Sequence, residues 1–149
     1  MGRQGVRLRD RALAQELGVA DRVRLTGARY GQDKLAALAA ADLFVLPSTF
    51  ESYGNAAAEA VAAALPVLLS DGCGIAPLIH GRAGLAVPPT VEGLGMGLAA
   101  LLGDEPRRAA LTRGRADVIT QLSWDEPLRQ LEGYYRHAVW PATQPTPAP

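Results

Sequence analysis

The sequence holds few of the residues that disulfides, metal sites and membrane spans require. Cys73 is the only cysteine among 149 residues, and His80 and His137 are the only histidines. A disulfide within the chain is therefore excluded, and a metal site is not expected. No apolar run reaches the roughly 18 residues of a membrane-spanning helix, and the N-terminus lacks the apolar segment of a secretory signal. We predict a cytoplasmic chain that needs no cofactor.

An excess of charge of either sign is also absent. The chain has 15 Lys and Arg residues against 15 Asp and Glu residues, so its formal net charge is zero. Nucleic acids and anionic membranes favour basic proteins, and neither is expected as the main partner. Hydrophobic residues make up 48% of the chain, which at this length is enough to build the core of one domain.

Short apolar runs alternate with helix-like segments along the chain. Residues 43–46, 66–70 and 84–87 are apolar and bounded by Pro or Gly, which is typical of strands buried in a parallel sheet. Residues 22–26 alternate between polar and apolar side chains and predict a further strand. This order of elements predicts an α/β fold, a Rossmann-like parallel sheet with flanking helices. Helices are expected over residues 6–18, 33–41, 54–64, 91–102, 104–120 and 125–138, with a short turn at 76–80.

The C-terminal part of the chain divides into a helix and a tail. In the helix over residues 125–138, Leu128, Leu131, Tyr134 and Tyr135 recur on one face, which we expect to point inward. The tail from residue 139 to 149 is rich in proline and should be disordered. We therefore assign residues 1–138 to one partial domain and residues 139–149 to a disordered tail.

Two glutamates, Glu51 and Glu59, lie in an otherwise apolar stretch on either side of Gly54. The segment between them follows a predicted strand, and parallel sheets bind ligands beyond the carboxyl ends of their strands. The glycine lets a ligand approach the backbone, the start of the next helix suits a phosphate, and carboxylates accept hydrogen bonds from hydroxyl groups. A diphosphate joined to a ribose and to a sugar matches this layout. A simpler interpretation is that Glu59 faces solvent on an alanine-rich helix and that Gly54 only caps it.

The two glutamates belong to a longer pattern. Residues 47–54 read PSTFESYG, and residues 59–67 read EAVAAALPV. This pattern, supported by matches over about residues 5–138, resembles the donor-binding half of retaining GT-B glycosyltransferases of group one, whose signature is two glutamates separated by seven residues. The resemblance implies a nucleotide-diphosphate sugar as donor and an acceptor hydroxyl as the second substrate.

The resemblance also implies a role for each matched residue. Glu51 would contact the transferred sugar at the reacting face, and Glu59 would bind the ribose of the nucleotide. The turn between them would meet the sugar and the phosphates through its backbone, and one position in the N-terminal part would contact the nucleobase through its backbone. The residues at these positions are Ser52, Tyr53, Gly54 and Asn55 in the turn, and Arg29 near the base.

The chain departs from the family pattern in several places. Ala64 replaces a usual glycine, and Tyr53 and Ser52 stand where phenylalanine and glycine are common. The family's diphosphate-binding Arg and Lys, the strands that carry them and the acceptor-binding domain have no match. We therefore expect a truncated donor domain, with any peripheral membrane association left to the absent domain. The central strand should have an open edge, which favours self-association.

Three functions follow from these observations. The leading one is transfer of a hexosyl group with retention, the isolated chain being inactive because it lacks the Arg/Lys pair and the acceptor domain. The second is an inactive or vestigial fragment that still binds a nucleotide sugar. The third is a different sugar-nucleotide enzyme on the same fold, such as an epimerase, and the pair Glu51 and Glu59 argues against it.

Two other motifs have simpler explanations. The glycines at positions 93, 95 and 97 superficially match a dinucleotide fingerprint, but they do not follow the first strand of a βαβ unit. We interpret them as part of an exposed, loosely specified helix. Cys73 lies between two glycines, and a buried inert thiol is a better interpretation than a reactive one.

Overall fold

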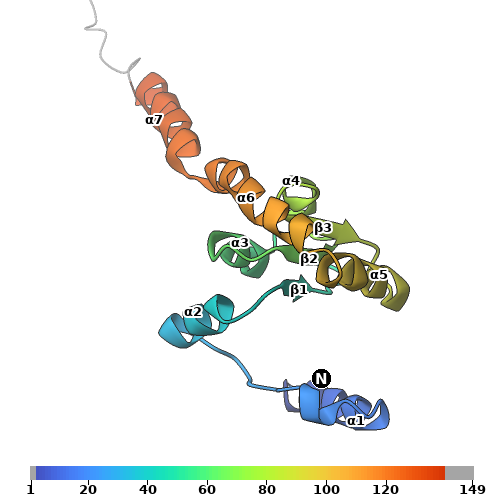
Figure 1. Ribbon diagram of the computed structural model, residues 1–149. Helices are drawn as coiled ribbons and strands as arrows, with labels where there is room; N and C mark the ends of the chain where they lie inside the picture. The colour runs from blue at the N-terminus through green and yellow to red at the C-terminus, as the bar shows by residue number, and fades with distance from the viewer. Residues whose placement is uncertain (1–2, 140–149) are drawn as a thin grey trace, which may run out of the picture. The chain divides into compact units, whose positions relative to one another are not determined.

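The computed structural model describes residues 3–139, which form two compact units on either side of the boundary between Ala37 and Leu38. Unit 1 is the N-terminal part and unit 2 the remainder of the chain. Figure 1 shows the order of the elements along the chain. The tail was predicted to begin at residue 139, but Val139 is the last residue of a helix. The rest of the predicted tail, residues 140–149, lies outside the described part.

Unit 1 is helical. It contains helix α1 (Arg3–Glu16), the 3-10 helix η1 (Ala20–Arg22) and most of helix α2 (Gly31–Ala39). Gly18 ends the first helix in the left-handed conformation, with φ 65°, which confirms the stop predicted there.

The predicted strand over residues 22–26 is wrong, because residues 23–30 contain neither helix nor strand. Val23 is extended, with φ −106° and ψ 120°. An extended segment becomes a strand only when a neighbour completes its hydrogen-bond ladder, and the described part of unit 1 has no second strand.

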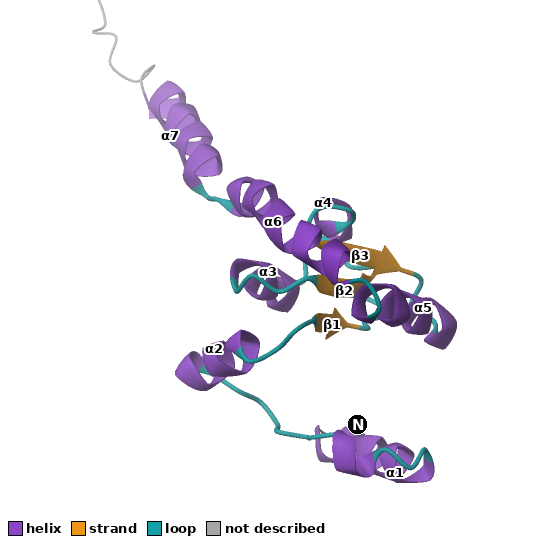
Figure 2. Cartoon of the chain, viewed as in Figure 1, coloured by secondary structure: helices purple, strands orange, loops and turns teal. Residues whose placement is uncertain are grey.

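Unit 2 is built on a parallel sheet of three strands in the order β1-β2-β3, drawn in orange in Figure 2. The sequence predicted all three strands to within two residues. Helices connect them as in an α/β fold, so the predicted fold class is confirmed for this unit. The strands are β1 (Phe44–Leu46), β2 (Val67–Ser70) and β3 (Gly84–Val87), and the helices are α3 (Asn55–Ala62), α4 (Ala76–Ile79), α5 (Val91–Leu102), α6 (Glu105–Leu122) and α7 (Asp125–Val139).

Strand β2 is the centre of the core because both faces of the sheet are covered there. Val67 and Leu69 pack with α3 and α4 on one face, and Leu68 packs with Leu85 and Leu101 on the other. All four residues of β2 are buried. This two-sided burial explains why the strand appears in the sequence as a continuous apolar run.

Two of the three glycines of α5, Gly93 and Gly97, allow close packing of the helix, and none of the three belongs to a nucleotide-binding turn. Gly97 lies against Leu68, whose Cδ1 would be 2.6 Å from a Cβ at the glycine. Gly93 is close to the carbonyl of Pro88, and both Gly93 and Gly97 are buried. The expectation of an exposed helix is therefore wrong for this face, although the rejection of the dinucleotide fingerprint stands.

The inward orientation predicted for the apolar face of α7 is wrong. Leu128 is 50% exposed, Leu131 48%, Tyr134 72% and Tyr135 63%. Periodicity showed that these side chains share a face, but it could not show whether another layer covers that face.

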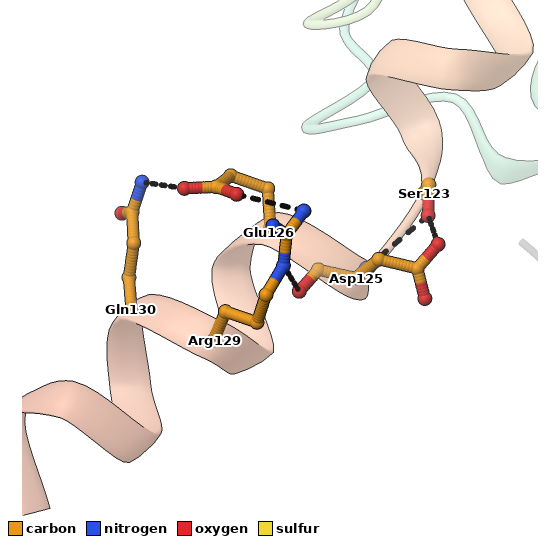
Figure 3. A network of polar contacts seen from close by, with 5 residues as sticks. All are labelled: Ser123, Asp125, Glu126, Arg129 and Gln130. Atoms are coloured by element: carbon orange, nitrogen blue, oxygen red, sulfur yellow. Dashed lines mark hydrogen bonds and ion pairs between the residues drawn. The ribbon is translucent and has the colours of Figure 1, made fainter.

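Local polar contacts hold the first turn of α7 instead (Figure 3). Ser123 precedes the helix and its Oγ accepts a hydrogen bond from the Asp125 N–H at 3.2 Å. Arg129 pairs with Glu126 at 2.9 Å, and Gln130 donates to the same carboxylate at 3.0 Å. Exposed contacts of this kind stabilise a helix by a few tenths of a kcal/mol each.

Candidate functional site

The predicted site lies on the segment between β1 and α3, which we call the Glu51 loop (residues 47–54). The loop begins directly after the last residue of β1 and ends directly before the first residue of α3. It is therefore at the carboxyl edge of the parallel sheet, where ligands bind in α/β folds. Within the loop the Ser48 hydroxyl donates to the Phe50 carbonyl at 2.8 Å.

Backbone hydrogen bonds tie the Glu51 loop to the loop that follows β2. The N–H of Gly74 donates to the carbonyl of Glu51 at 3.0 Å, and the N–H of Ile75 donates to the carbonyl of Tyr53 at 2.8 Å. Glu51 and Cys73 also form an isolated parallel bridge. The two loops continue the pairing of β1 with β2 beyond the sheet, which fixes the backbone around Glu51.

Two glycines make this close pairing sterically feasible. A Cβ at Gly74 would lie 2.2 Å from the Ser52 carbonyl oxygen, so a side chain there would push the loops apart. Gly54 has φ 107° and is buried, and a Cβ there would lie 2.9 Å from Cγ2 of Ile75. Gly54 was predicted from the sequence, whereas Gly74 was missed; its signal is a second glycine in the loop that follows a buried strand.

The structure places the two glutamates at different depths. Glu51 is half-buried beside the second loop, and Glu59 is the exposed fifth residue of α3, about one turn from its start. Among the described residues no side chain caps the start of α3, because Gly54 occupies that position. The N–H groups of the first turn of α3 carry a partial positive charge and lie along the chain between Glu51 and Glu59. The exposure of Glu59 also agrees with the simpler interpretation of a solvent-facing residue.

The other predicted turn residues lie along the same short segment. Ser52 and Asn55 are exposed, and Tyr53 is 46% exposed. Arg29 belongs to unit 1, where it forms an ion pair of 3.6 Å with Asp33. The structure therefore brings together the six predicted residues of unit 2, while the predicted role of Arg29 stays untested.

Cys73 is buried behind the Glu51 loop, as the sequence suggested. Burial raises the pKa of its thiol, the nearby Glu51 carboxylate adds to this rise, and a backbone hydrogen bond at Ser70 partly opposes it. The thiol is therefore protonated at neutral pH and unreactive. Ser70, at the end of β2, is fully buried, and its hydroxyl has no hydrogen-bond partner among the described residues.

Cations are absent from the part of the sequence that forms this site. After Lys34, the next Lys or Arg is Arg82, so neither loop carries one. No group of three His, Cys, Asp or Glu side chains that could hold a metal was found in the described part. None of the helices between residues 3 and 139 is long and apolar enough to cross a membrane.

Comparisons with known proteins identify the family of the chain. The model of the family described as glycosyl transferases group 1 matches residues 1–104. D-inositol 3-phosphate glycosyltransferase from Corynebacterium aurimucosum is 36% identical over 129 residues, covering 85% of this chain and 31% of the relative. The protein of the same name from Salinispora tropica is 36% identical over 131 residues, covering 85% of this chain and 27% of the relative.

Solved structures give the same result. Sucrose-phosphate synthase from Thermosynechococcus elongatus matches with a TM-score of 0.76 and 30% identity, over 90% of this chain and 34% of that structure. WaaG, a glycosyltransferase involved in lipopolysaccharide biosynthesis, matches with a TM-score of 0.66 and 33% identity, over 72% of this chain and 29% of that structure. The chain thus spans about a third of the length of its relatives. Its fold and sequence together show that it belongs to the glycosyl transferases group 1 family and corresponds to part of a GT-B glycosyltransferase.

Proposed function

We propose that unit 2 binds the nucleotide-diphosphate sugar donor of a retaining glycosyltransferase. The observation that carries this proposal is the backbone pairing of the Glu51 loop with Gly74 and Ile75. It holds Glu51, the uncapped start of α3 and Glu59 along one short segment at the carboxyl edge of the sheet. Such a segment offers N–H groups for phosphates between two carboxylates for hydroxyl groups.

Each carboxylate has a distinct role in this proposal. Glu59, one turn into α3, accepts hydrogen bonds from the two ribose hydroxyls, while Glu51 contacts the hexosyl group that is transferred. Ser52, Tyr53 and Asn55 line the path between them, with Gly54 leaving room for the phosphates. The contact of the base with the backbone at Arg29 stays a prediction from the family resemblance.

Transfer in this scheme depends on electrostatic stabilisation of the leaving diphosphate. The N–H groups at the start of α3 supply part of it. Because neither loop carries a Lys or Arg, the remaining positive charge must come from residues outside them. We expect the 149-residue chain to bind a donor nucleotide weakly and to transfer no sugar by itself.

Nucleotide titration tests the binding role of Glu59. UDP, GDP and ADP are titrated calorimetrically into the chain and into Glu59→Ala, with Glu92→Ala on α5 as the control. Loss of charge-assisted hydrogen bonds to the ribose should weaken the best nucleotide about tenfold or more. Equal binding by the chain and Glu59→Ala would rule out the ribose role, and a matching loss in Glu92→Ala would show a non-specific effect.

A second candidate is an inactive fragment that keeps the donor pocket. It is favoured by the absence of Lys and Arg between residues 35 and 81. The DNA upstream of the Met1 codon distinguishes the two candidates. A reading frame that continues into a strand followed by Arg and Lys would support the active enzyme. A stop codon directly upstream would support the inactive fragment.

Self-association is a further part of this proposal. Strand β1 is at one edge of the described sheet, and its three residues are only half-buried. An open apolar edge favours pairing with another chain. Analytical ultracentrifugation should show a concentration-dependent dimer, and a monomer that melts in one sharp transition at micromolar concentration would contradict this.

A further inference from the structure

A cavity lies at the other end of the sheet from the Glu51 loop. It has a volume of about 420 Å³ and lies between the turn before β3 and one face of α6. Gly81 and Arg82 precede β3, so the cavity is at the amino edge of the parallel strands. The proposed donor site is at the carboxyl edge, and the two sites are therefore separate.

Helix α6 presents one continuous face to this cavity. Its lining residues, 107, 110, 111, 114 and 117, recur at the spacing that places side chains on one side of a helix. The floor is apolar and includes the buried Leu85 and Leu111. A Cβ at Gly114 would lie 2.1 Å from the carbonyl oxygen of Arg82, so the two backbones are in close contact.

Two arginines and one aspartate provide the charge of the cavity. Arg82 and Arg107 line it, and within residues 3–139 neither guanidinium forms an ion pair or a side-chain hydrogen bond. Arg108, the neighbour of Arg107, instead donates to the carbonyls of Leu101 and Leu102 at 2.6 and 2.8 Å. Arg108 thus caps the C-terminal end of α5, whereas Arg82 and Arg107 remain available to bind an anion.

The carboxylate of Asp117 lies at the far end of the same face. It is ten residues from Arg107, which corresponds to about 15 Å along the helix axis. The backbone of Arg82 contacts the helix at Gly114, between these two ends, and Arg82 also lines the cavity. The cavity therefore offers two guanidinium groups for an anion and, further along, an acceptor for a hydroxyl group.

We propose that this cavity binds a small phosphate monoester, with Arg82 and Arg107 on the phosphate and Asp117 accepting a hydrogen bond from a hydroxyl of the organic part. Guanidinium groups bind phosphate oxygens through paired hydrogen bonds, which favours arginine at such sites. The volume falls within the range of about 300–1,000 Å³ typical of small-molecule pockets.

Calorimetric titration of the full chain with glycerol 3-phosphate at low salt tests the proposal. We expect one molecule bound per chain, and Arg82→Ala and Arg107→Ala should each weaken binding about tenfold. Asp117→Asn should weaken glycerol 3-phosphate but bind inorganic phosphate at least as well as the original chain, because it removes a like charge. This opposite response is not expected if the three residues are only structural.

Matched controls keep the test decisive. Arg113→Ala changes an exposed arginine of α6 that does not line the cavity, and Glu59→Ala changes the proposed donor site; both should bind as the original chain does. Circular dichroism checks the fold, and Arg82→Lys, which keeps the charge, replaces Arg82→Ala if that variant unfolds. Absence of binding at millimolar glycerol 3-phosphate would overturn the proposal. So would equal weakening by Arg113→Ala, or binding only to phosphatidic acid vesicles.

Discussion

Leu68 of unit 2 is fully buried, whereas Leu13 of unit 1 is 54% exposed, although both belong to regular secondary structure. The same contrast holds across the two units. Leu8 and Leu17 are also mostly exposed, and Ala14 is the one buried residue between positions 8 and 37. In unit 2, apolar layers cover both faces of β2. An apolar face becomes a core only where a second layer opposes it.

The largest expected effect is the difference in the free energy of unfolding between variants at these two leucines. Leu68→Ala should lower the free energy of unfolding by about 3 kcal/mol or more, because it leaves a cavity between β2 and α5. Leu13→Ala should change it by less than about 0.5 kcal/mol, as is usual for exposed positions. Urea unfolding followed by circular dichroism measures both. Similar losses in the two variants would mean that unit 1 has a core of its own.

A smaller effect is expected from two glycines of unit 2. Gly74→Ala should destabilise by about 2 kcal/mol, because the new methyl group would collide with the Ser52 carbonyl and separate the loops. Gly95→Ala, where no atom lies within 4 Å of a Cβ, should stabilise α5 by about 0.5–1 kcal/mol. Thermal unfolding of both variants measures this: the melting temperature should fall for Gly74→Ala and rise for Gly95→Ala. A stable Gly74→Ala variant would argue against the paired loops.

The sequence predicted the elements of unit 2 better than those of unit 1 for a physical reason. Residues 67–70 form a continuous apolar run because both faces of β2 are covered, and such a run is recognisable without knowing the partners. The alternating run at 22–26 also fits a strand, but a strand requires a neighbour that no local pattern supplies. The apolar face of α7 was predicted, whereas its exposure depends on contacts beyond the helix.

The candidate site was predicted in part. The spacing of Glu51 and Glu59 around Gly54 indicated a loop followed by a helix, and the structure confirms this. The second loop, with Gly74 and Ile75, was not assigned to the site because its role is to supply backbone N–H groups. Main-chain contacts between two loops depend on how the strands before them are placed in the sheet. No short stretch of sequence determines that placement, so it could not be predicted locally.

The third prediction concerns pH and the buried thiol of Cys73. Since burial raises the pKa of this thiol, the unfolded chain loses the proton at a lower pH than the folded chain. The stability of unit 2 should therefore be unaffected near neutrality and fall as the pH rises above the ordinary thiol value of about 8.5. Urea unfolding at several pH values measures this, and the loss of stability at high pH should be smaller in Cys73→Ala. An identical pH profile in that variant would contradict the assignment.

The smallest expected effect is that of removing unit 1. A chain of residues 38–149 should keep a cooperative unfolding transition, with a free energy of unfolding within about 1 kcal/mol of the original, because its core is formed by its own residues. Nucleotide binding should weaken if Arg29 contacts the base. A broad, non-cooperative melt would show that unit 1 stabilises unit 2.

The hydrogen bonds that join the two loops all come from the main chain, at Glu51, Tyr53, Gly74 and Ile75. The framework of the site is therefore largely independent of which side chains stand at the exposed positions of the Glu51 loop. Ser52, Tyr53 and Asn55 can be varied together in a combinatorial library while the two glycines are kept. Evolution and protein engineers have the same freedom here, since new ligand preferences can be sampled without rebuilding the scaffold.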